Sequence, residues 1–487
     1  MSNKLTSVVL GAALALLAVP GCDLNIPDLN NPGLEQLQNN PTAAGVNAAA
    51  TGMLVSLRGN KVAPTGFVNQ IGILGRESYD FDGNDARFVA EDIQGNLQKG
   101  SPFGGQFWNQ SYANIRGGNI ILHAIDKLTS FGDPMTVAAD KSAVKGFVET
   151  MQAMEFLLVT LTHYDTGAPV DVDRDLTAAL GPVVSKADVI KHIIELLDQG
   201  KTDLMNGGKA FTFPLPGYDG FDTPATFIAV NRAIKAKALA YTTDHSKVSY
   251  TAVLTALTES VAAAPLLNDV TTSKGFDLSA GVFYTYSTNP GDLPNTLFSR
   301  KSVLAHPKLE TEAQKQADGM TLDQRFQDKV KIVLDAMGNR KTTTSTNDPT
   351  LASALAFKIY TDAGSPIPMI KNEELILLKA EAQWFTGDKA GATTELNIVR
   401  TNSGKLPTLA QPADDAAFIT ALLYERRYSL MYEGGYRWID LRRFAIPLPV
   451  DKDGHARNIR FPIPQGECDG RPGEAACTIT STDAIHE

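Results

Sequence analysis

The chain has 487 residues, of which 43% are hydrophobic and 20% charged. This composition is that of a globular protein with a sizeable core, and it excludes a disordered or fibrous chain. The formal net charge of −10 argues against nucleic acid and anionic lipid head groups as main partners.

The first residues have the pattern of an export signal. Lys4 gives a positive start, and the apolar run Val8–Val19 is too short to span a bilayer. Gly21 and Cys22 close the run and resemble a lipobox, so residues 1–21 are predicted to be a lipoprotein signal peptide and Cys22 the lipid-bearing first residue of the mature chain. Ordinary signal cleavage beside an incidental cysteine is the alternative.

Residues 22–41 are rich in Asn and Pro and carry few bulky apolar side chains. We expect them to form a flexible tether. Thr42 is placed to cap a helix through Ala43–Leu57, and residues 42–487 are expected to form a single α-rich domain.

An irregular acidic stretch follows at residues 76–105. Asp80, Asp82, Asn84 and Glu91 fall at positions 1, 3, 5 and 12 of a calcium-loop pattern, but its sixth position lacks the required glycine. We therefore expect an acidic turn here, without a metal.

Three stretches predict pairs of antiparallel helices, near residues 145–205, 227–264 and 372–400. The last is the clearest, because Ala380 and Ala382 allow close packing and Gly387 makes a turn between two helical patterns. The predicted fold class is therefore mainly α, a tetratricopeptide-like scaffold of helical pairs with long loop-rich insertions.

The stretch Phe418–Arg443 also has helical spacing, with two arginines on or beside the face meant for burial. An unpaired buried charge is very costly, so we expect nearby carboxylates to pair with these arginines, and Glu433 stands four residues before Arg437. We predict a structural ion-pair network made of Glu425, Arg426, Arg427, Glu433, Arg437 and Asp440.

These residues, ERRYSLMYEGGYRWIDLRR in sequence, resemble the C-terminal signature of the SusD/RagB family. Further similar segments are WNQSY at 108–112, AEA through NIVR at 380–400, and RFPIP at 460–464. The sequence departs from the usual signature at Ser429, where the family often has an acidic residue, and in the extra residue of Gly434-Gly435. The resemblance implies a SusD-like fold and an outer-membrane lipoprotein that captures nutrients, usually glycans, for a TonB-dependent transporter of the SusC type.

Cys468 and Cys477 flank a Gly/Pro-rich loop. In an exported chain such a pair is expected to form a disulfide, with two free thiols as the alternative. The spacing and the few nearby histidines make a poor zinc site.

Sequence motifs of catalysis are lacking. The chain contains no H-E-x-x-H, G-x-S-x-G, P-loop or G-x-G-x-x-G motif. Glu373 and Glu374 are adjacent on a predicted helix, where their side chains point about 100° apart, so we expect them to supply charge at a helix N-terminus. We expect no enzyme activity and no cofactor.

Loops at 76–108, 211–224 and 283–300 combine aromatic with polar side chains. Aromatic rings stack on the apolar faces of sugars, and Asn, Asp and Arg bind sugar hydroxyls. The residues predicted to bind ligand are Arg76, Tyr79, Phe81, Asn84, Phe103, Tyr284 and Tyr286.

Three hypotheses follow. The first is a non-catalytic, surface-anchored lipoprotein that binds an oligosaccharide or other nutrient and delivers it to a transporter. The second is a tetratricopeptide-type scaffold that binds envelope proteins, and the third is a glycoside hydrolase on a helical frame. The signature favours the first over the second, and the missing catalytic motifs weigh against the third.

Overall fold

The computed structural model describes residues 34–129, 131, 137–175, 177–272 and 275–482. The predicted signal peptide, Cys22 and most of the predicted tether lie outside the described residues. None of the described helices is long and apolar enough to cross a membrane.

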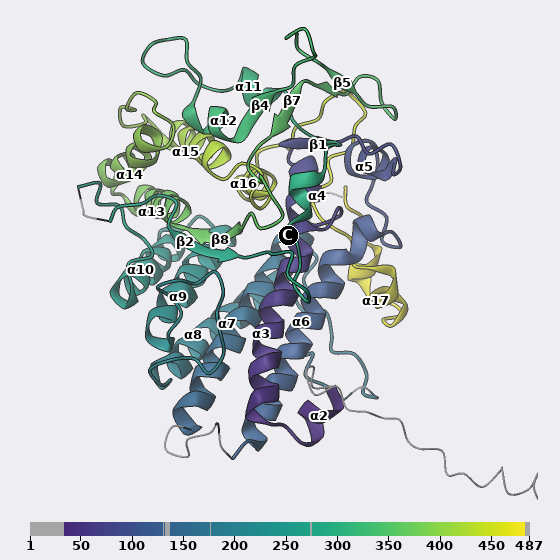
Figure 1. The fold of residues 1–487 in the computed structure, drawn as a ribbon, viewed down its shortest axis with the longest axis vertical. Coiled ribbons are helices and arrows are strands. Elements are labelled where there is room, and N and C mark those ends of the chain that lie inside the picture. Colours follow the sequence, from purple (N-terminus) through teal and green to yellow (C-terminus); the bar gives the residue numbers. More distant parts are fainter. Residues whose placement is uncertain (1–33, 130, 132–136, 176, 273–274, 483–487) are drawn as a thin grey trace, which may run out of the picture.

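Long helices form one half of the molecule, and short helices and strands form much of the other (Figure 1). The fold class predicted from the sequence is confirmed, because α7 packs on α8, α9 on α10, and α13 on α14 as antiparallel pairs. The longer helices are α3 (Ala43–Val62), α6 (Pro102–Lys127), α7 (Val137–His163), α8 (Lys186–Met205), α9 (Pro224–Tyr241), α10 (Lys247–Ala263), α13 (Asn372–Thr386), α14 (Lys389–Asn402) and α15 (Asp415–Ser429).

Local chemistry explains where these helices begin and turn. Thr42 and Ser185 accept hydrogen bonds from the first-turn amides of α3 and α8. Gly387 adopts a left-handed conformation (φ 106°) that ends α13, and Asp388 then caps α14.

The remaining elements are short. In the described part of the chain, eight strands form four separate antiparallel pairs, β1 with β3, β2 with β8, β4 with β7 and β5 with β6. The strands are β1 (Ser78–Asp80), β2 (Gly281–Tyr284), β3 (Val303–Ala305), β4 (Val330–Ile332), β5 (Thr343–Thr344), β6 (Ala352–Ser353), β7 (Leu355–Phe357) and β8 (Ile367–Lys371). The short helices are α2 (Leu34–Asn39), α4 (Phe67–Leu74), α5 (Arg87–Val89), α11 (Lys308–Thr311), α12 (Gln324–Lys329), α16 (Tyr436–Arg443) and α17 (Gln465–Asp469), with a π-helix at Ala90–Gln94 and 3-10 turns at Thr296–Ser299 and Ala475–Thr478.

The stretch Phe418–Arg443 forms two helices, α15 and α16. Helix α15 ends at Ser429, and Gly435 is left-handed (φ 69°) immediately before α16. A Cβ atom at Gly435 would lie 2.3 Å from Ile71 Cγ2, so only glycine lets the chain pass α4 here.

Candidate functional site

Five of the seven predicted ligand residues are buried, namely Arg76, Tyr79, Phe103, Tyr284 and Tyr286. Arg76 Nε and the Tyr79 hydroxyl donate to the two carboxylate oxygens of Asp451, each at 2.6 Å. Phe103 is 1% exposed and Tyr286 is 5% exposed. Arg76, Tyr79, Phe103 and Tyr286 therefore offer little surface to a ligand, and their part in ligand binding stays a prediction.

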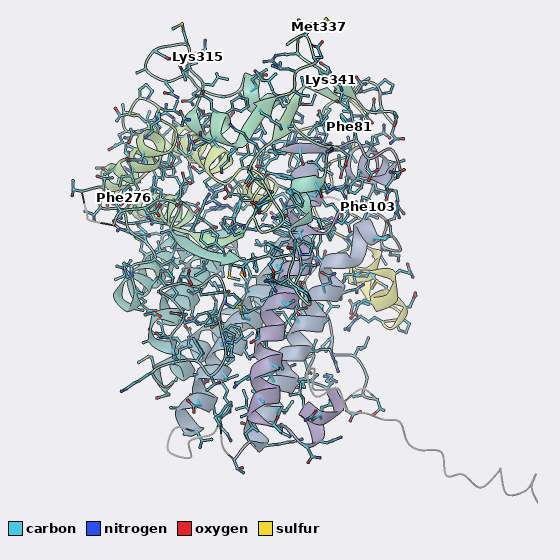
Figure 2. The ribbon with its side chains drawn as sticks, in the orientation of Figure 1. Phe81, Phe103, Phe276, Lys315, Met337 and Lys341 are labelled. Carbon is cyan, nitrogen blue, oxygen red and sulfur yellow. A yellow bond between two sulfur atoms is a disulfide. The ribbon has the colours of Figure 1, made fainter. Side chains whose placement is uncertain are left out.

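The two other residues from this first loop remain accessible. Phe81 is half-buried and stacks on Tyr79 with ring centroids 5.1 Å apart. Asn84 is exposed and its amide donates to Asp82. Figure 2 shows Phe81 and Phe103 in the upper part of the molecule.

Asp80, the first residue of the calcium-loop pattern, is bound by other side chains. The buried carboxylate of Asp80 accepts a hydrogen bond from Asn69 at 2.8 Å and pairs with Arg300. Within the described ranges, no group of three His, Cys, Asp or Glu side chains is placed to hold a metal ion.

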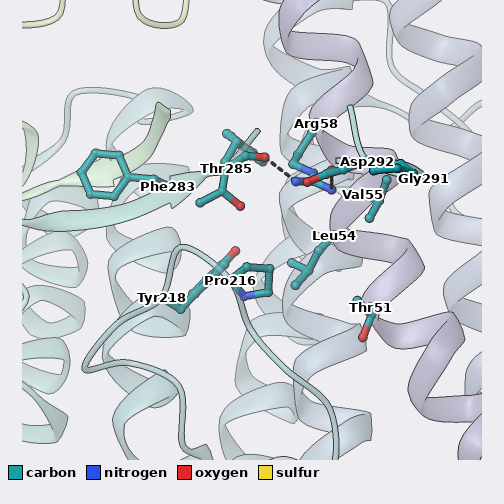
Figure 3. A pocket seen from close by; sticks show the side chains of 12 residues that line it. Thr51, Leu54, Val55, Arg58, Pro216, Tyr218, Phe283, Thr285, Gly291 and Asp292 are labelled. Carbon is teal, nitrogen blue, oxygen red and sulfur yellow. Dashed lines mark hydrogen bonds and ion pairs between the residues drawn. The ribbon is translucent and has the colours of Figure 1, made fainter. Parts of the chain in front are cut away.

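Tyr284, the seventh predicted residue, lines a pocket of about 290 Å³ (Figure 3). The pocket lies where α3 meets the loops 211–224 and 283–300, which the sequence had singled out separately. Its volume is near the lower end of the range for ligand pockets, about 300–1,000 Å³. It therefore has room for a small ligand or for one unit of a larger ligand.

A single glycine joins the two loops. Gly217 accepts a hydrogen bond from the amide of Phe283 at 3.0 Å. Its φ is +89°, and a Cβ atom there would lie 2.2 Å from the Phe283 carbonyl oxygen. A side chain at this position would push the first loop away from β2, so Gly217 is required for the pocket wall.

One wall of the pocket is apolar and another carries an ion pair. Leu54, Val55 and Pro216 supply apolar surface. Arg58 Nη2 donates to Asp292 Oδ1 at 2.8 Å, and the Arg58 side chain is 7% exposed against 29% for Asp292. Figure 3 shows this pair facing the pocket, with the ring of Phe283 directed away from it.

The ion pair has unused hydrogen-bonding capacity. Arg58 Nε is buried and has no acceptor within the described part of the chain. Burial opposes ionisation of Asp292, but the Leu293 amide, the Ser287 hydroxyl and Arg58 lower the pKa of its carboxyl. The pair thus places an ionised acceptor, Asp292, at the pocket beside a mostly buried guanidinium, with no net charge, which suits a neutral ligand that carries hydroxyl groups.

Beneath the pocket lies a buried cation. Lys61 Nζ is 5.2 Å from the ring centroid of Tyr284 and 4.5 Å from that of Phe67. Burial lowers the pKa of Lys61 to about 8, although Glu155 acts in the opposite direction. Arg58 and Lys61 were not predicted as pocket residues, because the helix predicted from the sequence ended at Leu57. Helix α3 continues to Val62 and places Arg58 and Lys61 four residues after Leu54 and Leu57 on its apolar face.

The predicted ion-pair network is buried, and one of its local pairs is present. Arg426 is 0% exposed, and its Nε donates to Asp440 Oδ2 at 2.7 Å. The other carboxylate oxygen of Asp440 accepts from Arg443 Nε at 2.8 Å. Asp440 therefore neutralises two guanidinium groups on neighbouring helices.

The other carboxylates pair with distant segments. Glu425 binds Arg325 at 2.7 Å and Arg400 at 2.9 Å. Arg427 pairs with Glu312, beyond α11. Local sequence spacing therefore did not identify these partners.

The predicted pair between Glu433 and Arg437 is wrong. Glu433 binds Lys329 at 2.7 Å and Lys371 at 2.6 Å, and these lysines lower the pKa of its carboxyl despite burial. The four-residue spacing between Glu433 and Arg437 has no helical meaning, because α15 ends before Glu433 and α16 begins after it.

Cys468 and Cys477 are joined by a disulfide, with Cα atoms 5.6 Å apart. It closes the loop that follows α17. This segment packs near the N-terminus of α6, where Gly105 approaches Pro464.

Residues 361–460 match the model of the SusD family. A comparison with curated protein sequences finds no match. The matched range contains α13 to α16 and, among the buried arginines described above, Arg400, Arg426, Arg427 and Arg443.

Solved structures share the fold over most of the chain. A SusD-like carbohydrate-binding protein from Bacteroides fragilis has a TM-score of 0.68 at 16% identity and covers 90% of this chain and 100% of its own. The surface glycan-binding protein A of Bacteroides uniformis has a TM-score of 0.64 at 18% identity, covering 91% and 100%. A SusD superfamily protein from Bacteroides vulgatus has a TM-score of 0.62 at 16% identity, covering 90% and 98%.

At these identities the solved structures show a common fold, and the family model adds a sequence match over the C-terminal helices. Together they show a SusD-like fold and, over residues 361–460, a sequence similarity to the SusD family.

Proposed function

We propose that the protein is a non-catalytic lipoprotein of the outer membrane that binds a glycan at the cell surface and passes it to a TonB-dependent transporter. The resemblance of the chain to the SusD family suggests this role, and two similar structures are described as carbohydrate-binding or glycan-binding proteins. Anchoring would depend on a lipid at Cys22.

The observation that carries the binding proposal is the pocket between α3 and the two loops. Its apolar wall can pack on the C–H face of a sugar ring, while Arg58 and Asp292 can donate to and accept from adjacent hydroxyls. A neutral pair of this kind favours a neutral sugar over an acidic one, because the Arg58 charge is already balanced by Asp292.

Affinity electrophoresis tests the proposal. The protein without its signal peptide and lipid is run through gels that contain different polysaccharides, and each mixture is assayed for released reducing ends. Retardation on a glycan without release is the expected result. Release would indicate a glycoside hydrolase, and retardation on none of the glycans would favour a protein-binding scaffold.

A further inference from the structure

Arg437 belongs to the C-terminal signature but lacks the partner that the sequence predicted. It is mostly buried, and within the described residues no hydrogen bond or ion pair joins it to another side chain. Burial and the neighbouring Arg427 lower the pKa of Arg437 to about 10. A guanidinium in this setting is costly unless something else compensates its charge.

Arg442, further along α16, is a buried arginine whose charge is compensated by backbone carbonyl groups. No carboxylate of the described residues pairs with it either, yet Nε, Nη1 and Nη2 donate to three backbone carbonyl oxygens at 3.1, 2.8 and 2.6 Å. Its guanidinium also lies 3.3 Å from the ring centroid of Trp438. Arg437 has no such acceptors among the described residues.

The neighbouring arginine is also incompletely satisfied. Arg427 is 6% exposed, and only its Nη1 reaches a carboxylate, that of Glu312. Arg427 Nε, Arg427 Nη2 and Arg437 Nε are all buried without an acceptor in the described part of the chain. Two guanidinium groups of like charge therefore lie near one another with three unused nitrogen donors.

The surrounding groups leave this cluster electropositive. Lys308 on α11 adds positive charge, and Lys329 on α12 is already balanced by Glu433. Glu312, at 43% side-chain exposure, lies toward solvent. Glu77, between α4 and β1, is buried, and burial raises the pKa of its carboxyl to about 7 against the effect of both arginines. One oxygen of Glu77 has no partner among the described residues, so Glu77 does not neutralise Arg437 by direct contact.

We propose that Arg427 and Arg437 together bind a small oxyanion, with the chemistry of a phosphate, a sulfate or a carboxylate. The planar guanidinium fork matches the oxygen geometry of these anions, and charge-assisted hydrogen bonds would satisfy the three unused donors. The site is separate from the pocket at Arg58, since it lies between α15 and α16, and it does not depend on the proposed glycan binding.

Thermal unfolding in the presence of inorganic phosphate tests this site, with ionic strength held constant by sodium chloride. The unfolding midpoint of the protein is expected to rise with phosphate and to saturate, as for a ligand that binds the folded state. Arg437→Gln is expected to raise the half-saturating phosphate concentration at least tenfold. The matched control is Arg340→Gln, because Arg340 is exposed and already paired with Glu310, and its phosphate response is expected to equal that of the parent.

Two further measurements separate anion binding from a purely structural role. Without phosphate, Arg437→Gln is expected to be at least as stable as the parent, because it removes repulsion from Arg427; a structural arginine satisfied by water would instead destabilise the protein when replaced. Glu77→Gln removes a carboxylate that competes with the anion, so it is expected to lower the half-saturating concentration.

Parallel titrations with sulfate and acetate identify the source of the anion. A response to acetate as well as phosphate supports a site for the carboxylate of an organic ligand, and a response to phosphate and sulfate alone supports a free inorganic ion. The proposal would be overturned if none of the three anions changed the unfolding midpoint of the parent protein. It would also be overturned if phosphate shifted the unfolding midpoints of the parent and of Arg437→Gln equally.

Discussion

Replacing Asp440 with asparagine should destabilise the protein far more than any change to a surface ion pair. The carboxylate of Asp440 accepts from Arg426 at 2.7 Å and from Arg443 at 2.8 Å, and all three side chains are at least nine-tenths buried. Asparagine keeps the shape but removes the charge, and its amide group would face a guanidinium. Breaking one partner of a buried ion pair costs about 3–5 kcal/mol, and Arg443 keeps only Glu381 as a carboxylate partner.

The matched control is Asp85→Asn. Asp85 also pairs with one arginine, Arg87, at 2.8 Å, but that arginine is 45% exposed. Exposed pairs contribute about 0–1 kcal/mol, so the two variants should differ several-fold in their loss of free energy of unfolding. Urea unfolding followed by tryptophan fluorescence measures both losses, provided that the m value is unchanged. If Asp440→Asn cost no more than Asp85→Asn, the view that this network stabilises the C-terminal helices through charge pairing would be refuted.

Three further predictions concern the fold. Burial and nearby Asp203 raise the pKa of Glu149 to about 8, although Lys145 acts in the opposite direction. Between about pH 4.5 and 8 the folded state therefore binds a proton that the unfolded state has lost, so the free energy of unfolding should fall as the pH rises. In pH-dependent urea unfolding, Glu149→Gln should flatten this slope and add on the order of 2 kcal/mol to the free energy of unfolding at pH 8. Gly435→Ala should lower the free energy of unfolding by about 2 kcal/mol or more, because the new Cβ would lie 2.3 Å from Ile71 Cγ2 at a φ of +69°. Gly83→Ala is the control and should be nearly neutral in the same assay, because a Cβ there meets open space. Cys468→Ser should lower the free energy of unfolding by about 2–3 kcal/mol relative to the oxidised parent, since the disulfide closes a loop with a sequence separation of 9. The parent protein treated with reductant should unfold at the same urea concentration as the variant.

The helical scaffold could be predicted because its signals are local. Thr42 caps α3 at the position expected, and Gly387 makes the expected turn between α13 and α14. Hydrophobic periodicity and capping act within a few residues, so they are visible in sequence without knowledge of distant contacts.

Partner choice among buried charges could not be predicted in the same way. Glu425 pairs with Arg325, a hundred residues away, and Glu433 pairs with Lys371 rather than with Arg437. A buried charge must be compensated, but the compensating residue is fixed by how helices pack and not by sequence distance.

The ligand loops show the same limit. Tyr79 and Tyr284 both lie in aromatic, polar loops, yet Tyr79 is locked to Asp451 while Tyr284 lines a pocket. The charged wall of that pocket comes from Arg58, on a helix more than two hundred residues earlier than its partner Asp292. Composition identified the loops, and only their packing against α3 identified the site.

The most direct test of the proposed function compares pocket variants on whichever glycan retards the parent protein. Arg58→Lys keeps the charge but removes the guanidinium fork, and Asp292→Asn removes the ionised acceptor. Arg87→Lys is the matched control, because Arg87 and Asp85 form a similar pair outside the pocket, joined by two hydrogen bonds of 2.8 Å. The proposal predicts that both pocket variants lose most of their retardation while the control keeps it. The assignment of this pocket as the glycan site would be contradicted if both pocket variants were fully retarded, or if only Arg87→Lys lost its retardation.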